Sequence, residues 1–132
     1  SSSVSLGYAL NSKKQVVCLD GDGSILMHLG SLRNLAYFGK SNLKHILINN
    51  NSHESVGGQK TSAKGIDFKK LVKSLGYKNY FKISKQSELK KKILKLFKSK
   101  GPSFLEVKVG LGSIENLTRP KNLLDIKNKF TK

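Results

Sequence analysis

Short apolar runs alternate with amphipathic segments from one end of the chain to the other. Four runs of apolar and β-branched residues, bounded by glycine or polar residues, predict buried strands. These runs cover residues 15–20, 43–49, 80–83 and 103–109. Between them, apolar residues recur at helical spacing, which predicts helices over 2–11, from the turn at 21–24 to Gly39, over 67–76 and from Ser87 onward. Strands that alternate with crossover helices indicate an α/β fold with a mainly parallel sheet and helices on both faces.

Three further segments complete this prediction. Residues 50–65 are rich in asparagine, serine and glycine, so we expect a loop. Leu89, Ile93, Leu96 and Phe97 follow an i, i+4, i+7, i+8 pattern, which is typical of a helix stripe that packs against a core. Periodicity is weaker in the tail, residues 110–132. The length of 132 residues suits one compact domain.

Composition narrows the class of protein. The longest apolar runs are far shorter than the roughly 18 residues that a membrane-spanning helix needs, so we expect no membrane partner. Cys18 is the only cysteine and lies in an apolar run. It is therefore expected to be a small core residue rather than a nucleophile, and a lone thiol favours a reducing, cytoplasmic location.

The formal net charge of +17 raises the question of nucleic-acid binding. Most lysines fall on the polar faces of predicted helices, and the only arginines are Arg33 and Arg119. Phosphate and base recognition favours arginine, and no interleaved aromatic platform accompanies the lysines. We therefore expect a solvated, lysine-rich surface that helps to attract an anionic substrate. A basic module that binds a polyanion without catalysis stays open as an alternative of another class.

A glycine turn follows the first predicted strand. Gly21, Gly23 and Ser24 lie where that strand meets a helix, and such a turn lets backbone N–H groups approach a phosphate at the positive end of the helix dipole. The sequence GDGSIL does not meet the dinucleotide-binding pattern GxGxxG. Taken alone, the turn is a weak signal.

A second polar segment strengthens this prediction. Asn50 follows Asp22 by 28 residues and belongs to the triplet Asn49-Asn50-Asn51 that ends the next strand. A carboxylate and a carboxamide are hard oxygen donors of the kind that Mg²⁺ takes while it keeps positions for phosphate oxygens and water. An asparagine triplet by itself also suits a simple turn at the end of a strand.

Together the two segments resemble a known family. The stretch GDGSILMHLGSL…NLKHILINNNSHESVGGQKT resembles the signature of thiamine-diphosphate enzymes, in which GDG is followed after about two dozen residues by NN. The fold that this implies is the flavodoxin-like, three-layer thiamine-diphosphate-binding fold. Within that superfamily, the loop from His53 to Gln59 looks most like phosphonopyruvate decarboxylases, and the related sulfopyruvate decarboxylases have a similar Gly-Gly-Gln segment.

The resemblance implies roles for particular residues. The side chains of Asp22 and Asn50 and the backbone carbonyl of Ser52 would bind Mg²⁺, with Asn49 as the alternative to Asn50. The diphosphate of the cofactor would be held by the backbone of Gly21, Gly23 and Ser24 and by the Ser24 hydroxyl.

Four residues beside these motifs carry histidine or carboxylate groups. His53 and Glu54 adjoin the expected metal loop and are candidates for substrate contact or proton transfer. A solvated loop histidine with an acidic neighbour is an equally good interpretation. His28 and His45 lie inside a predicted helix and a predicted strand and are expected to be structural.

The implied activity is the decarboxylation of a 2-oxo acid, with phosphonopyruvate giving phosphonoacetaldehyde and CO2. A sulfopyruvate decarboxylase subunit and an acetolactate-synthase-like enzyme are the alternatives in the same class. Members of the family carry a glutamate on a separate pyrimidine-binding domain, and no segment here matches that domain. We therefore expect the chain to be a truncated diphosphate- and magnesium-binding half that is inactive alone. It would pair, in an oligomer, with a pyrimidine-binding domain of the same or a partner chain through an apolar surface.

Overall fold

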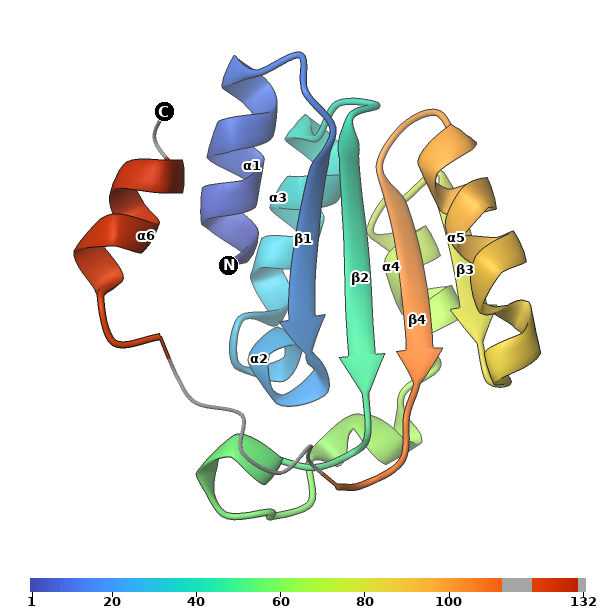
Figure 1. The fold of residues 1–132 in the computed structure, drawn as a ribbon. Coiled ribbons are helices and arrows are strands. Elements are labelled where there is room, and N and C mark those ends of the chain that lie inside the picture. Colours follow the sequence, from blue (N-terminus) through green and yellow to red (C-terminus); the bar gives the residue numbers. More distant parts are fainter. Residues whose placement is uncertain (113–119, 131–132) are drawn as a thin grey trace.

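The computed structural model of the chain describes residues 1–112 and 120–130, which form one sheet flanked by helices (Figure 1). All strand pairs are parallel, and the order across the sheet is β1-β2-β4-β3. The strands are β1 (Val16–Gly21), β2 (Leu43–Asn49), β3 (Asn79–Ile83) and β4 (Ser103–Lys108). The parallel α/β prediction is confirmed, and each predicted strand lies within about a residue of its observed bounds.

The helices follow the predicted alternation with one correction. They are α1 (Ser2–Asn11), α2 (Asp22–Met27), α3 (Leu29–Phe38), α4 (Phe68–Ser74), α5 (Leu89–Lys98) and α6 (Leu123–Phe130). The prediction of one unbroken helix from the 21–24 turn to Gly39 is wrong, because His28 leaves helical geometry at φ −133° and ψ 44°. The His28 carbonyl accepts hydrogen bonds from the Ser31 backbone N–H and hydroxyl, and this starts α3 as a new helix.

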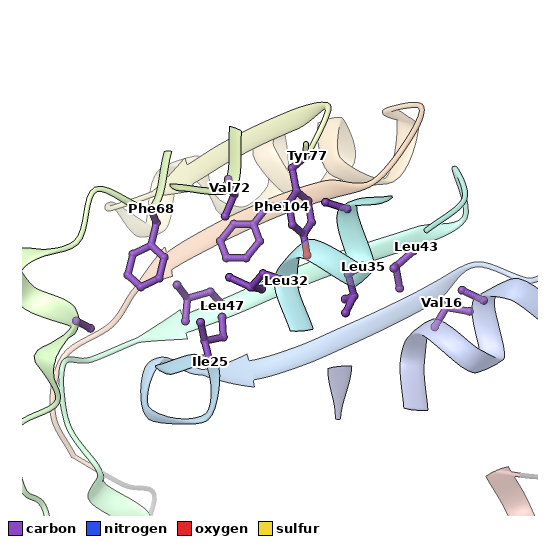
Figure 2. Close-up of a cluster of buried hydrophobic side chains, with 13 residues drawn as sticks. Val16, Ile25, Leu32, Leu35, Leu43, Leu47, Phe68, Val72, Tyr77 and Phe104 are labelled. Carbon is purple, nitrogen blue, oxygen red and sulfur yellow. The ribbon is translucent and has the colours of Figure 1, made fainter. Parts of the chain in front are cut away.

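The larger hydrophobic core lies between the sheet and helices α1 to α4 (Figure 2). Phe104 on β4 is fully buried there and contacts the rings of His45, Phe68, Tyr77 and Tyr80, with centroid separations of 5.1 to 6.5 Å. These contacts have the offset and edge-to-face geometries that aromatic pairs favour. They join β2, β3 and β4 to α4 on one face of the sheet.

The opposite face of the sheet is covered unequally. Helix α5 packs against β3 and β4 through a cluster that includes Leu96 and Leu105. On β1 and β2 the same face leaves Val17, Leu19 and Ile48 with 39%, 60% and 39% of their surfaces exposed. Helices therefore do lie on both faces, as predicted, but one half of the second face is an open apolar surface.

The tail contains a helix, α6, although its apolar periodicity is weak. Helix α6 lies beside α1 (Figure 1), where the rings of Phe130 and Tyr8 have centroids 5.2 Å apart. Residues 113–119 and 131–132, which belong to the same weakly periodic tail, lie outside the described residues. Within the described residues, no helix combines the length and the apolar character that crossing a membrane requires.

Candidate functional site

A cavity of about 420 Å³ opens at the carboxyl ends of β1 and β2. Because parallel strands bring their carboxyl ends to one edge of a sheet, the two polar segments singled out in the sequence meet there. All eight predicted site residues line this cavity: Gly21, Asp22, Gly23, Ser24, Asn50, Ser52, His53 and Glu54. The remaining lining residues are Met27, Ile48, Ser55 and Val56.

Asp22 is the first residue of α2, and only 1% of its surface is exposed. The Thr61 hydroxyl donates a hydrogen bond to Asp22 Oδ2. Thr61 is itself fixed, because its backbone N–H donates to the Asn51 carbonyl over 3.0 Å. The Asp22 carboxylate is thus oriented by a residue 39 positions away, which the sequence analysis did not identify.

The structure separates Asn49 from Asn50. Asn49 is fully buried, its Nδ2 donates to Glu106 Oε1 over 3.0 Å, and its Oδ1 accepts from the Asn51 backbone N–H over 3.2 Å. Asn50 lies on the cavity wall, where its Oδ1 accepts from the Ser52 backbone N–H over 3.0 Å. A carbonyl oxygen has two lone pairs, so Asn50 Oδ1 retains one for a further partner. Of the two residues, only Asn50 lines the cavity, whereas Asn49 is fully buried.

The loop after β2 is held in a tight conformation. Asn51 adopts the left-handed conformation at φ 58°, which asparagine tolerates better than most residues. Ser52 pairs with Lys60 in an isolated antiparallel bridge, and Gly57 and Gly58 have φ of 124° and 78°. Asn51 Oδ1 is buried, with no hydrogen-bond partner among the described residues.

His53 lies directly against the glycine turn. A Cβ added at Gly23 would stand 2.3 Å from His53 Cε1 and 2.4 Å from Nδ1, so the imidazole fills the space that a side chain at position 23 would need. In contrast, a Cβ added at Gly21 would meet nothing within 4 Å. The turn is therefore covered by the loop at Gly23 and open at Gly21.

The Glu54 carboxylate stabilises the same loop through two hydrogen bonds. Its Oε2 accepts from Asn50 Nδ2 and its Oε1 from the Gly112 backbone N–H, each over 2.5 Å. These two bonds join the loop, the end of β2 and the segment that follows β4. The carboxylate is exposed and stands at the rim of the cavity, beside Asn50.

A buried polar network lies behind the turn, centred on Asp20 and His45. His45 is fully buried; its Nε2 lies 3.0 Å from Asp20 Oδ2 and its Nδ1 lies 2.9 Å from Tyr77 Oη. Burial alone would raise the pKa of Asp20, but hydrogen bonds from His45, Ser1 and Ser2 outweigh it and hold that pKa well below its usual range. Burial alone would lower the pKa of His45, but its hydrogen bonds to Asp20 and Cys18 outweigh burial and raise it. His45 and Asp20 therefore form a buried, hydrogen-bonded pair, which is an ion pair whenever His45 is protonated.

Of the histidines and the cysteine that were expected to be structural, His45 and Cys18 belong to this network and His28 does not. His45 and Cys18 are structural core residues, as expected. Their shared partner Asp20 was not identified from the sequence, because an aspartate at a strand end is equally well explained as a turn residue. His28, expected inside a helix, is exposed at the break between α2 and α3.

The cavity has the donor set for a magnesium ion and a diphosphate. Asp22 and Asn50 offer a carboxylate and a carboxamide oxygen from the ends of adjacent strands, and these are the hard ligands that Mg²⁺ prefers. The backbone at Gly21 is open, and the turn begins α2, where backbone N–H groups lack helical partners. The residues present therefore fit both groups.

A parallel α/β sheet with a glycine turn and oxygen-bearing side chains at its carboxyl edge is an arrangement that commonly binds phosphorylated ligands. Comparison with known families agrees: the family model described as thiamine pyrophosphate enzyme, C-terminal TPP binding domain, matches residues 1–107. The chain belongs to this family.

Curated relatives of the chain are named phosphonopyruvate decarboxylase or sulfopyruvate decarboxylase. The chain is 34% identical over 118 residues to the phosphonopyruvate decarboxylase of Streptomyces viridochromogenes, covering 89% of this chain and 30% of the relative. It is 42% identical over 76 residues to the sulfopyruvate decarboxylase subunit beta of Methanocaldococcus jannaschii, covering 57% of this chain and 40% of the relative. The chain thus spans less than half the length of each of these two relatives.

Solved structures agree on the fold. The thiamine-diphosphate-dependent 4-hydroxybenzoylformate decarboxylase of Rhodococcus jostii RHA1 superposes with a TM-score of 0.68 at 21% identity, covering 82% of this chain and 22% of that chain. A thiamin-diphosphate-dependent enzyme from Mycobacterium smegmatis gives a TM-score of 0.64 at 19% identity, covering 77% and 19%. At these identities the likeness establishes the fold.

Proposed function

We propose that the chain is the diphosphate- and magnesium-binding half of a thiamine-diphosphate-dependent decarboxylase of a 2-oxo acid. The observation that carries this proposal is the convergence of Asp22 and Asn50 on one cavity beside an open glycine turn. Family membership supports the cofactor, and the hard oxygen donors support Mg²⁺.

Different residues of the cavity would hold the metal ion and the diphosphate of the cofactor. Asp22, Asn50 and the Ser52 carbonyl would hold Mg²⁺, and the backbone N–H groups of the turn would hold the diphosphate. The Ser24 hydroxyl donates to Asp20 Oδ1 over 3.0 Å, so the backbone of Ser24 is better placed than its hydroxyl to donate to a phosphate. When bound, thiamine diphosphate supplies the electron sink that decarboxylation of a 2-oxo acid needs.

His53 and Glu54 remain the candidates for contact with substrate or for proton transfer. Both lie on the cavity wall, and Glu54 is exposed at its rim. His53 packs against Gly23, next to the expected diphosphate position, so its imidazole is placed to contact the anionic end of a ligand.

Phosphonopyruvate is the substrate that we favour. The relatives named phosphonopyruvate decarboxylase align with 89% of this chain at 34% and 35% identity. The net charge of +17 supports an anionic substrate, since a basic surface raises the local concentration of anions.

Sulfopyruvate is the second candidate. Over a shorter stretch of 76 residues, two relatives named sulfopyruvate decarboxylase subunit beta are 42% and 43% identical to this chain. Both substrates are 2-oxo acids with an anionic group at the far end, so the same cavity serves either proposal.

The remaining half of the active site would come from a pyrimidine-binding domain, on the same chain or on a partner subunit of an oligomer. The apolar surface formed by Val17, Leu19 and Ile48 supports such a contact, since open apolar patches mark association surfaces. The lone buried thiol of Cys18 supports a cytoplasmic location.

The test is a decarboxylation assay of the full-length protein, or of this chain with its partner subunit, on phosphonopyruvate, sulfopyruvate and pyruvate. We expect activity that requires thiamine diphosphate and Mg²⁺, with the highest kcat/KM for phosphonopyruvate. A preference for sulfopyruvate would select the second candidate, and a clear preference for pyruvate would refute both.

Two variants make this test specific. Asp22→Asn should lower kcat/KM by at least about 100-fold, because losing a metal ligand exceeds the 10- to 100-fold loss typical of outer-shell changes. Asp125→Asn is the matched control, since it makes the same change on exposed helix α6, outside the cavity. Polyanion binding that weakens with salt and is unaffected by Asp22→Asn, without decarboxylation, would favour the non-catalytic alternative.

A further inference from the structure

Asp20, the residue immediately before the glycine turn, is a hydrogen-bond hub. Its carboxylate is 5% exposed and accepts hydrogen bonds from five side chains. The donors are Ser1, Ser2 at 2.9 Å, Cys18 at 3.4 Å, Ser24 at 3.0 Å and His45 at 3.0 Å. They come from the start of α1, from β1, from α2 and from β2. One carboxylate therefore joins α1, β1, α2 and β2 next to the turn.

The bond from Ser24 closes the turn itself. Ser24 Oγ donates to Asp20 Oδ1 across the three residues 21–23, which carry the open backbone at Gly21 and the side chain of Asp22. Ser24 also lines a second cavity, of about 380 Å³, on the side of Ser1 and Ser2. The turn thus stands between two cavities, and Asp20 lies behind it in the core.

His45 fixes Asp20 from the opposite side. Its ring is held at Nδ1 by Tyr77 Oη and packs edge-on against Phe104, with centroids 5.1 Å apart. The Asp20 carboxylate is therefore held in one position relative to the sheet. Its hydrogen bond from Ser24 in turn fixes where the turn lies relative to the sheet. A hydrogen-bonded carboxylate held by a locked partner is the arrangement that orients ligand-binding groups from behind.

A metal-binding site is the alternative interpretation of this cluster, since ligand atoms of Cys18, Asp20 and His45 lie within 4.8 Å of one another. The serine hydroxyls argue against it. Ser1, Ser2 and Ser24 all direct hydrogens to Asp20, where a cation would need oxygen lone pairs. The cluster is therefore a hydrogen-bond network.

We propose that Asp20, held by His45, is the positioning residue of the cofactor turn: it sets the conformation of residues 21–23 through Ser24 without touching the cofactor. This inference rests on the proposed function of the turn. It predicts that changes at Asp20 act on cofactor affinity, whereas the chemistry at saturating cofactor is left nearly intact.

The experiment uses the complete enzyme, with thiamine diphosphate titrated at fixed Mg²⁺ and saturating substrate. Asp20→Asn keeps the shape of the side chain but turns one acceptor into a donor that faces other donors. We expect it to raise the cofactor KM by about tenfold or more while kcat changes by less than about twofold. Leu96→Ala is the control, because it empties a fully buried site on the opposite face of the sheet and should leave the cofactor KM unchanged.

A milder variant keeps the proposal testable if Asp20→Asn folds poorly. Ser2→Ala removes one donor from the hub and should raise the cofactor KM by about threefold, again with little change in kcat, as expected for one lost hydrogen bond. If Leu96→Ala raises the cofactor KM as much as Asp20→Asn does, or if neither hub variant changes it, Asp20 has no positioning role. A wild-type enzyme without saturable dependence on thiamine diphosphate would instead overturn the proposed function of the turn.

Discussion

The contact between His53 and Gly23 gives a prediction that requires neither cofactor nor substrate. An alanine Cβ at position 23 would lie 2.4 Å from His53 Nδ1, whereas ordinary contacts begin at 3.4 Å, so the ring must retreat by about 1 Å. Backbone hydrogen bonds fix His53 within its loop. The His53 backbone N–H donates to the Gln59 carbonyl over 2.8 Å, and the His53 carbonyl accepts from Val56 and Gly58 over 3.0 Å each. The strain must therefore fall on the imidazole.

Two opposing contributions set the change in the free energy of unfolding that Gly23→Ala causes. Overpacking costs about 1–3 kcal/mol, and the half-buried ring places this site near the lower value, about 1 kcal/mol. Replacing glycine by alanine inside a helix stabilises by up to about 1 kcal/mol, and Gly23 is in α2 without a positive φ. Gly23→Ala alone should therefore change the free energy of unfolding by less than about 1 kcal/mol.

A double-mutant cycle separates the two terms. His53→Ala removes the ring, so adding Gly23→Ala to it should stabilise the chain by about 1 kcal/mol more than Gly23→Ala does in the presence of the ring. The assay is urea denaturation of the four proteins, analysed by linear extrapolation. If the two changes are additive within about 0.5 kcal/mol, the ring does not occupy the space above Gly23 and this reasoning is wrong.

Three further predictions concern stability and association. Phe104→Ala should lower the free energy of unfolding by about 3–5 kcal/mol in a denaturant titration, since Phe104 is fully buried among four other rings; a loss below about 1 kcal/mol would contradict its central role. The pKa of His45 is raised above its ordinary 6.5, so the stability from its ion pair with Asp20 is complete below pH 6.5 and is lost as pH rises through the raised pKa. Unfolding measured from pH 6 to 10 should show this loss in the wild type, and His45→Gln should flatten it; equal slopes would exclude His45 as its source. Leu19→Lys should reduce self-association of the isolated chain in sedimentation experiments without changing its melting temperature, whereas unchanged association would show that the open face of β1 is not the contact.

The sequence by itself determined the features that depend on local patterns. The apolar runs of the four strands and the helical stripes between them specify a parallel α/β sheet, because each element must bury its own apolar side. The turn at Gly21–Ser24 and the asparagines after β2 were also visible, because turn residues follow from local backbone chemistry. Parallel strands place their carboxyl ends at one edge, so the meeting of these two segments was predictable as well.

Only the tertiary structure decided which atoms face the cavity. The choice between Asn49 and Asn50 depends on which of two neighbouring side chains points into the core, and a shift of one residue reverses that. The bond from Thr61 to Asp22 and the pairing of Asp20 with His45 join residues 39 and 25 positions apart, and no local pattern encodes such contacts. The break at His28 likewise arises from competition between a continuing helix and the hydrogen bonds of Ser31 to the His28 carbonyl. Periodicity fixes the side of an element that is buried, whereas the partner of each polar group is fixed only when distant segments pack together.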